Sequence, residues 1–139
     1  MQKPEIIFFD IKGDDEGSLI ALESNRNVPF EIKRTYYIYG TTEGVTRGHH
    51  AHHKLKQLLI CVNGSVEIYC EYGEKEEVFL LDNPDKGLIL EGLIWHKMMN
   101  FSPNTVLLVL ADDYYDESDY VRNYDEFLKL NRSLWCNKI

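Results

Sequence analysis

The 139-residue sequence is short of cysteine, has no excess of basic residues and contains no long apolar run. Its three cysteines, Cys61, Cys70 and Cys136, form no CxxC pair, which is typical of reduced thiols in a cytosolic protein. No apolar stretch approaches the roughly 18–20 residues that cross a bilayer, and the N-terminus lacks the apolar core of a signal peptide. We therefore expect a cytoplasmic protein without a membrane partner.

The formal net charge is −8, from 23 acidic and 15 basic residues. A surface of this sign repels nucleic acid and anionic membranes, so we expect neither as a partner. It does not exclude a small anionic ligand, because a few arginines in a pocket dominate the electrostatics at contact distance.

At this length we expect a single domain over residues 1–139. Short runs of β-prone residues alternate with turn clusters, which indicates about ten strands and an all-β sandwich or small barrel. The Asn63-Gly64 pair predicts a hairpin with a type I′ turn. The apolar segment 5–11 would be an aggregation-prone edge if exposed, which predicts that it pairs with a second subunit.

The C-terminal part of the chain has a different pattern. Apolar residues recur there near helical spacing, at Val121, Tyr124, Phe127 and Leu128. This spacing predicts one C-terminal helix over about 118–130, packed on the outside of the barrel. The same region is rich in acidic and aromatic residues, which indicates either a solvated face or a tyrosine-lined ligand surface.

Four of the five histidines lie in the segment "RGHHAHH" at residues 47–53. Residues two apart in a strand share a face, so His50 and His52 point one way while His49 and His53 point the other. Only one pair can face a common pocket. The spacing around the cluster indicates which pair this is.

Five residues around the cluster have a fixed spacing, with five, one, four and six residues between them: Gly44, His50, His52, Gln57 and Gly64. This spacing resembles the first cupin motif, in which a glutamate stands where this chain has glutamine. In metal-binding cupins these positions and a later histidine, here His96, hold a divalent ion. Glutamine is an uncharged and weak ligand, so we expect no metal, and the inward histidines then suggest proton transfer.

Longer stretches resemble the WxcM-like family of sugar-nucleotide 3,4-ketoisomerases over nearly the whole chain. They include "IKRTYYIYG", "RGHHAHHKLKQLLICVNGSVEI", "WHKMMNFS" and "VLLVLADDYYDESDYVRNYDEF". The resemblance implies an all-β, RmlC-like cupin jelly-roll barrel with one C-terminal helix. It also implies a homodimer that exchanges its N-terminal strands. The implied reaction converts dTDP-4-keto-6-deoxyglucose to the 3-keto sugar without a metal or cofactor, for 3-amino-3,6-dideoxy sugars of surface glycans such as O-antigens and S-layers.

The resemblance also assigns roles to residues. The implied catalytic residues are His50, His52 and Tyr37. The implied substrate-binding residues are Arg47, expected near the diphosphate, with Gln57, His96 and, more weakly, Lys54. The family commonly has an arginine-glycine pair before its second strand, and this chain has Glu16-Gly17 instead.

The reaction needs a base that removes the C3 proton, which the C4 ketone acidifies, and a donor that protonates C4 of the enediolate. A neutral histidine suits the first step, and we assign it to His50. His52 is expected to act as a relay or as a donor to the oxygens, and the two roles could be exchanged. Tyr37 is expected to donate a hydrogen bond to the developing oxyanion or to shuttle a proton.

Two alternatives remain open from the sequence. One is a sugar-nucleotide 3,5-epimerase, which also begins by deprotonating a carbon beside the ketone. The other is a non-catalytic cupin that binds a small molecule. A metal-dependent dioxygenase is disfavoured by Gln57. The sequence leaves the C4 stereochemistry of the product and the identity of the nucleotide base open.

Overall fold

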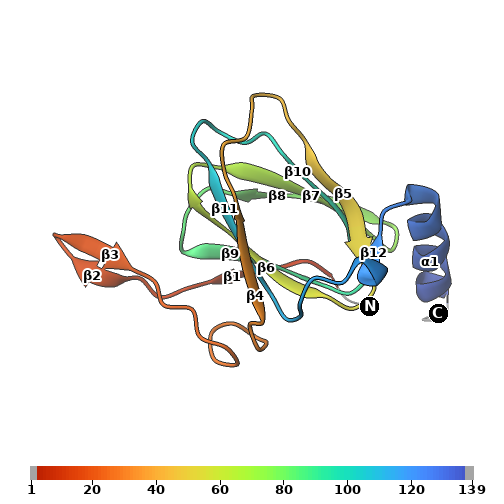
Figure 1. The fold of residues 1–139 in the computed structure, drawn as a ribbon, viewed down its shortest axis with the longest axis horizontal. Coiled ribbons are helices and arrows are strands. Elements are labelled where there is room, and N and C mark those ends of the chain that lie inside the picture. The colour runs from red at the N-terminus through yellow and green to blue at the C-terminus, as the bar shows by residue number, and fades with distance from the viewer. Residues whose placement is uncertain (1–2, 137–139) are drawn as a thin grey trace.

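The computed structural model describes residues 3–136, which form two five-stranded antiparallel sheets packed face to face. The first sheet contains β1 (Glu5–Phe8), β9 (Lys86–Glu91), β6 (Lys56–Asn63), β11 (Val106–Ala111) and β4 (Arg34–Ile38), in that order. The second contains β12 (Tyr120–Val121), β5 (Arg47–His52), β10 (Trp95–Met99), β7 (Val66–Tyr72) and β8 (Lys75–Leu81). Figure 1 shows the two layers and the single C-terminal helix beside them, which confirms the predicted all-β class.

The central strand β6 packs into an apolar cluster on each face of the first sheet. Leu59 and Cys61 point into the core between the sheets, while Leu58 and Ile60 point to a second apolar cluster on the outer face. The second cluster is closed by Val28 and Phe30 from the long segment before β4. Burial on both faces makes this strand a continuous apolar run rather than an alternating one.

The predicted hairpin at Asn63-Gly64 is wrong, because β6 and β7 lie in different sheets. Gly64 does adopt a positive φ of 81°, but the turn carries the chain from one sheet to the other. A Cβ at Gly64 would lie 2.5 Å from the Ser102 hydroxyl oxygen. That hydroxyl in turn accepts a 2.9 Å hydrogen bond from the Ser65 amide. The corner is therefore fixed by the loop before β11 and not by pairing of its own two strands.

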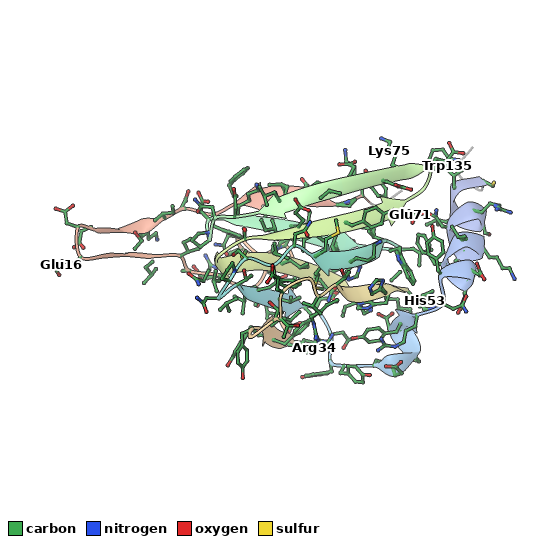
Figure 2. All side chains as sticks on the ribbon, turned by 90° about the horizontal axis from the view of Figure 1, so that it is seen from above. Glu16, Arg34, His53, Glu71, Lys75 and Trp135 are labelled. Atoms are coloured by element: carbon green, nitrogen blue, oxygen red, sulfur yellow. The ribbon has the colours of Figure 1, made fainter. Side chains whose placement is uncertain are left out.

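The N-terminal strand β1 is shorter than the predicted 5–11 and pairs with β9 of its own chain, from Glu5 opposite Ile89 to Phe8 opposite Lys86. It ends because Phe9 turns its ring into the outer apolar cluster. The next two strands, β2 (Lys12–Asp14) and β3 (Gly17–Leu19), form a hairpin whose residues are all exposed. This hairpin projects away from the two sheets, and Figure 2 shows Glu16 at its tip.

The predicted helix start near 118 is wrong, since residues 117–121 form a 3-10 turn (Glu117–Asp119) and β12. β12 pairs with β5 and buries Val121. The α-helix α1 runs from Tyr124 to Cys136. It begins there because the Asn123 side chain accepts from the Glu126 amide at 2.9 Å. Phe127 anchors α1 against Trp95. Within residues 3–136, no helix has the length and apolarity needed to span a membrane.

Candidate active site

The site begins at a β-bulge in β5. The pairing of β5 with β10 shifts by one residue, so that His96 faces His50 while Lys97 faces Gly48. The extra residue is His49, which has a positive φ of 60° and an exposed side chain. Gly48 has a φ of 95°, and a Cβ there would lie 3.0 Å from the His96 carbonyl oxygen. The bulge therefore requires this glycine and turns His50 toward the inside of the barrel.

Three histidine rings meet behind this bulge. The ring centroids of His50 and His96 are 4.7 Å apart, those of His50 and His52 are 5.0 Å apart, and those of His52 and His96 are 6.1 Å apart. His52 and His96 are buried, and His50 is partly buried. His49 and His53 are exposed, as strand alternation predicts. The structure thus brings the predicted pair together and adds His96 to it.

The hydrogen-bond partners define where two of the rings carry their protons. His96 Nδ1 donates to the Ile94 carbonyl oxygen at 3.1 Å, and His52 Nδ1 lies 3.1 Å from Asp119 Oδ2. A carbonyl or carboxylate oxygen only accepts, so each Nδ1 carries the proton and each Nε2 is left with a lone pair. Both Nε2 atoms, together with His50 Nδ1, are buried without a hydrogen-bond partner among the described residues.

The pKa values of all three histidines are lowered from the ordinary histidine value. Burial, and after it the proximity of His50, lowers the pKa of His52 and of His96 to about 3. Burial likewise lowers the pKa of His50 below its ordinary value. The neutral imidazole is therefore the stable form of each ring near pH 7, and a neutral imidazole can accept a proton.

A cavity of about 460 Å³ opens over His50. Its lining comes from β4, β5, β10 and the segment 120–122: Arg34, Tyr36, Tyr37, Ile38, Arg47, Gly48, His50, Met98, Tyr120 and Arg122. Three of these residues are arginines, and guanidinium groups match the geometry of phosphate oxygens. The cavity thus joins an anion-binding wall to a cluster of neutral bases.

Tyr120 covers the histidines from the side of β12. Its ring centroid lies 4.4 Å from that of His52 and 5.1 Å from that of His50. The Arg122 guanidinium lies 4.1 Å from the centre of the Tyr120 ring and forms two hydrogen bonds to Glu117, at 2.7 and 3.0 Å. The sequence did not single out these three residues. The only signal for them was the acidic and aromatic composition of this region.

Tyr37 does not lie against the histidines as its predicted catalytic role requires. Tyr37 lines the cavity but is 62% exposed, and its ring lies beside Tyr39, with 5.9 Å between the centroids. Tyr36 packs against the core between the sheets, so it is the tyrosine of β4 that points inward. Its hydroxyl accepts a 3.1 Å hydrogen bond from Gln57 Nε2, and burial raises its pKa.

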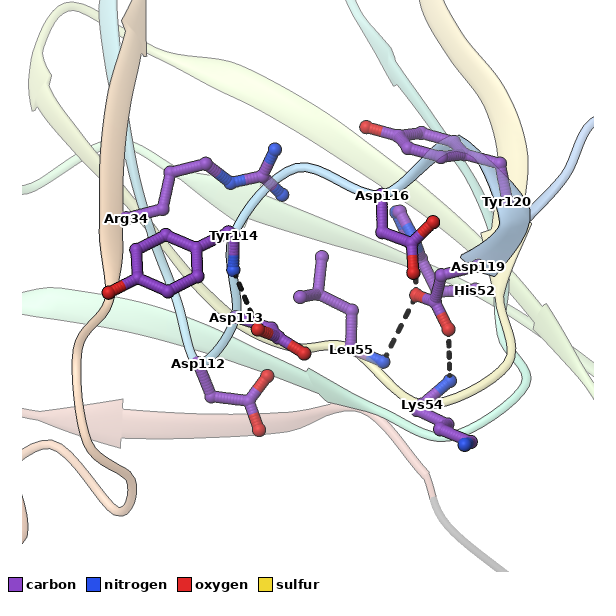
Figure 3. Close-up of a pocket in the computed structure, with 10 residues that line it drawn as sticks. All are labelled: Arg34, His52, Lys54, Leu55, Asp112, Asp113, Tyr114, Asp116, Asp119 and Tyr120. Carbon is purple, nitrogen blue, oxygen red and sulfur yellow. Dashed lines mark hydrogen bonds and ion pairs between the residues drawn. The ribbon is translucent and has the colours of Figure 1, made fainter.

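The remaining predicted residues fall in different places. Arg47 lines the cavity over His50. Gln57 is buried and faces Tyr36 rather than the histidines. Lys54 lines a second cavity, of about 170 Å³, on the other side of His52. Figure 3 shows this second cavity, and Arg34 is common to both.

The three histidines are the residues of the described chain whose ligand atoms could converge on a metal ion, since these atoms lie within 4.8 Å of one another. The set offers three neutral imidazoles and no carboxylate. Gln57, which takes the glutamate position of the cupin motif, is engaged with Tyr36. The absence of a bound metal stays a prediction.

Comparison with known proteins identifies the family. The model of the family described as FdtA: WxcM-like, C-terminal, matches residues 2–132. A protein of Aneurinibacillus thermoaerophilus, named TDP-4-oxo-6-deoxy-alpha-D-glucose-3,4-oxoisomerase, is 49% identical over 116 residues, which are 84% of each chain. QdtA, a sugar 3,4-ketoisomerase from Thermoanaerobacterium thermosaccharolyticum solved in complex with TDP, has a TM-score of 0.93 at 42% identity, over 95% of this chain and 96% of that one.

Two further solved structures extend the comparison. WlaRB, a TDP-quinovose 3,4-ketoisomerase from Campylobacter jejuni, has a TM-score of 0.88 at 47% identity, over 93% of this chain and 99% of that one. The Mycobacterium tuberculosis rmlC epimerase has a TM-score of 0.70 at 18% identity, over 84% of this chain and 66% of that one, which establishes the shared RmlC-like cupin fold alone. The chain therefore belongs to the FdtA family of WxcM-like, C-terminal proteins, which confirms the resemblance noted in its sequence.

Proposed function

We propose that the protein is a sugar-nucleotide 3,4-ketoisomerase that converts dTDP-4-keto-6-deoxyglucose to the corresponding dTDP-3-keto-6-deoxyhexose. One observation carries the proposal: a cluster of neutral histidines lies at the wall of a cavity lined by three arginines. Relatives at 42–49% identity that bear this activity in their names support it. The arrangement supplies both an acid/base centre and a place for a diphosphate.

The arginines give the orientation of the substrate. Arg34, Arg47 and Arg122 line the cavity together with His50, so a diphosphate bound to them leaves the attached hexose beside the histidine cluster. The exposed Tyr37 ring lines the cavity and suits contact with the flat face of the nucleotide base. Tyr37 therefore takes a binding role in the proposal in place of its expected catalytic role.

His50 is the proposed base at carbon. It is the histidine that lines the larger cavity, and its lowered pKa keeps it neutral near pH 7. It removes the proton from C3, and the electron pair of that C–H bond forms the C3–C4 double bond of an enediolate. A proton then goes to C4, and one proton moves from the C3 hydroxyl to the oxygen at C4. C3 is oxidised from an alcohol to a ketone while C4 is reduced from a ketone to an alcohol. The two changes balance within one molecule, so the reaction needs no external oxidant or reductant.

The oxygens of the enediolate need hydrogen-bond donors. The Tyr36 hydroxyl accepts from Gln57, so its own O–H is free to donate toward the cavity that it lines. His52 lies behind His50 and is proposed to carry the proton that passes between the oxygens. Donors that are already in place when charge develops are typically a large part of catalysis.

We also propose a homodimer in which β1 is exchanged between subunits. Exchange would keep the register of β1 on β9 and move the projecting hairpin onto the partner. Three large apolar side chains on this arm are exposed in the single chain: Phe8, Ile11 and Leu19. Size-exclusion chromatography with light scattering tests the dimer, and a monomer at micromolar concentration would contradict it.

The proposed product carries a ketone at C3, which suits an aminotransferase that makes 3-amino-3,6-dideoxy sugars.

The reaction is identified by the position of the ketone. The protein is incubated with dTDP-4-keto-6-deoxyglucose that is ¹³C-labelled in the hexose, and the carbonyl carbon is followed by NMR. The proposal predicts that the carbonyl moves from C4 to C3. A product inverted at C3 and C5 that keeps its C4 ketone would identify an epimerase. Tight binding of dTDP with an unchanged sugar would identify a non-catalytic binding protein.

A further inference from the structure

We propose that Asp119 is the positioning residue of this site: it holds His52 with its proton on Nδ1, so that the unprotonated Nε2 faces the other histidines. The inference rests on the proposed function, because it assigns Asp119 a part in that reaction. Asp119 does not touch the cavity over His50 and acts only through His52.

The contacts of Asp119 come from one turn after β5. Oδ2 accepts from His52 Nδ1 at 3.1 Å and from the Leu55 amide at 3.3 Å, while Oδ1 accepts from the Lys54 amide at 2.9 Å. The backbone carbonyl of Asp119 accepts from the His53 amide at 2.9 Å. Figure 3 shows the carboxylate between the His52 ring and this turn. The end of β5 is thus tied to a residue far along the chain.

The three groups that form hydrogen bonds with the carboxylate are two backbone amides and His52 Nδ1. The amides of Lys54 and Leu55 have no other state, and an ionised carboxylate has no proton to give to His52 Nδ1. The imidazole must therefore carry its proton on Nδ1. The partner of one ring nitrogen sets the state of the other, so Nε2 is left as the basic atom.

The His52 ring is confined by its neighbours. It packs against both the Tyr120 and the His50 rings, at centroid distances of 4.4 and 5.0 Å, and its side chain is 4% exposed. Nε2 has no hydrogen-bond partner among the described residues. Asp119 directly precedes Tyr120 in the chain, so one short segment supplies both the carboxylate and the ring that covers His52.

An asparagine at this position would disturb the tautomer without changing the shape of the side chain. If the asparagine oxygen takes the amide of Lys54, its NH₂ group replaces Oδ2, opposes the Leu55 amide, and converts His52 Nδ1 into an acceptor. The proton of His52 then moves to Nε2, and the site loses its inner base. If the amide is turned the other way, its NH₂ group opposes the Lys54 amide, which also donates.

The test uses Asp119→Asn with Asp113→Asn as the matched control. Asp113 lines the same smaller cavity, and within residues 3–136 the hydrogen bond to its side chain comes from the adjacent Tyr114 amide at 2.8 Å. Asp119→Asn should lower kcat on the order of 10–100-fold, as the loss of a supporting carboxylate does at metal-bound histidines. The KM should stay within about threefold, because the arginines that hold the nucleotide are untouched. Asp113→Asn should leave both constants unchanged.

¹⁵N NMR of the histidine side chains gives the readout that a structural role would not move. In the wild-type protein His52 should show a protonated Nδ1 and a free Nε2, and Asp119→Asn should reverse this, while Asp119→Glu should keep the wild-type tautomer. A protonated Nε2 in the wild type would overturn the inference, and so would a loss of kcat in Asp119→Asn with an unchanged tautomer. The wild-type spectrum decides the orientation even if the asparagine variant does not fold. Wild-type protein with no ketoisomerase turnover but a protonated Nδ1 would overturn the proposed function and leave this orientation standing.

Discussion

His96 lies directly opposite His50 in the β5–β10 ladder, and the two ring centroids are 4.7 Å apart. This pairing depends on the bulge at His49, because the register shifts by one residue immediately beside it. The position of His50 in the histidine cluster therefore depends on the β-bulge.

Replacing Gly48 should damage the site through the backbone. Gly48→Ala places a Cβ 3.0 Å from the His96 carbonyl oxygen at a φ of 95°, so we expect a destabilisation of about 1–3 kcal/mol and loss of most turnover. Thermal unfolding and steady-state kinetics measure the two effects. Gly44→Ala is the control, because Gly44 also has a positive φ but open space around it. Equal loss of turnover in both variants would contradict the role of the bulge.

The two histidines on either side of the strand should behave differently. His50→Asn should abolish turnover and leave dTDP binding intact, since the arginines hold the diphosphate. His49→Asn should change little, because the side chain is exposed and asparagine tolerates the positive φ of 60° at this position. Kinetics and calorimetric titration with dTDP measure both. A His49→Asn variant as impaired as His50→Asn would show that the wrong face of β5 has been assigned.

Substitution of the two adjacent tyrosines of β4 should affect kcat to different extents. Tyr36→Phe removes an inward hydroxyl and should lower kcat on the order of 100-fold, as the loss of an oxyanion donor does in other enzymes. Tyr37→Phe should lower kcat less than about threefold, because its ring lines the cavity but is exposed. The reverse order of the two effects would restore the catalytic role that the sequence assigned to Tyr37.

The protein should lose stability as the pH falls below about 6.5, the ordinary histidine value. Burial lowers the pKa of His52 and His96 to about 3 in the folded state, so the unfolded chain binds more protons between these values. Stability is therefore fully present above pH 6.5 and is lost as the pH falls toward the folded pKa. Urea unfolding at pH 7.5 and pH 5 measures this loss. A His96→Gln variant with an undiminished pH dependence would argue against a neutral buried His96.

Part of this site could be predicted from the sequence. The period of two in a strand separated His50 and His52 from His49 and His53, and the cupin spacing pointed to His96. The same period could not decide between Tyr36 and Tyr37, because it defines two faces without saying which one is inside. Only the packing of Tyr36 against the core settles that choice.

The contributions of Asp119, Tyr120 and Arg122 could not be predicted because helical spacing continues through their region. Val121 fits the apolar pattern of the later helix, yet it is buried in β12. The true start of the helix is set by the Asn123 cap, which is a contact between a side chain and one backbone amide. At the Asn63-Gly64 turn only Gly64 has the positive φ that the predicted type I′ turn requires at both residues, and β6 and β7 lie in different sheets.

The proposed reaction depends on histidine acid/base catalysis without a metal ion. The most direct measurement is the turnover of protein freed of metal by chelation, with dTDP-4-keto-6-deoxyglucose in D₂O and the sugar followed by ¹H and ¹³C NMR. Acid/base catalysis by the histidines should give undiminished formation of a 3-keto product with no deuterium at C5. Turnover that appears only after iron, manganese or zinc is added, or deuterium at C5 with the ketone still at C4, would contradict it.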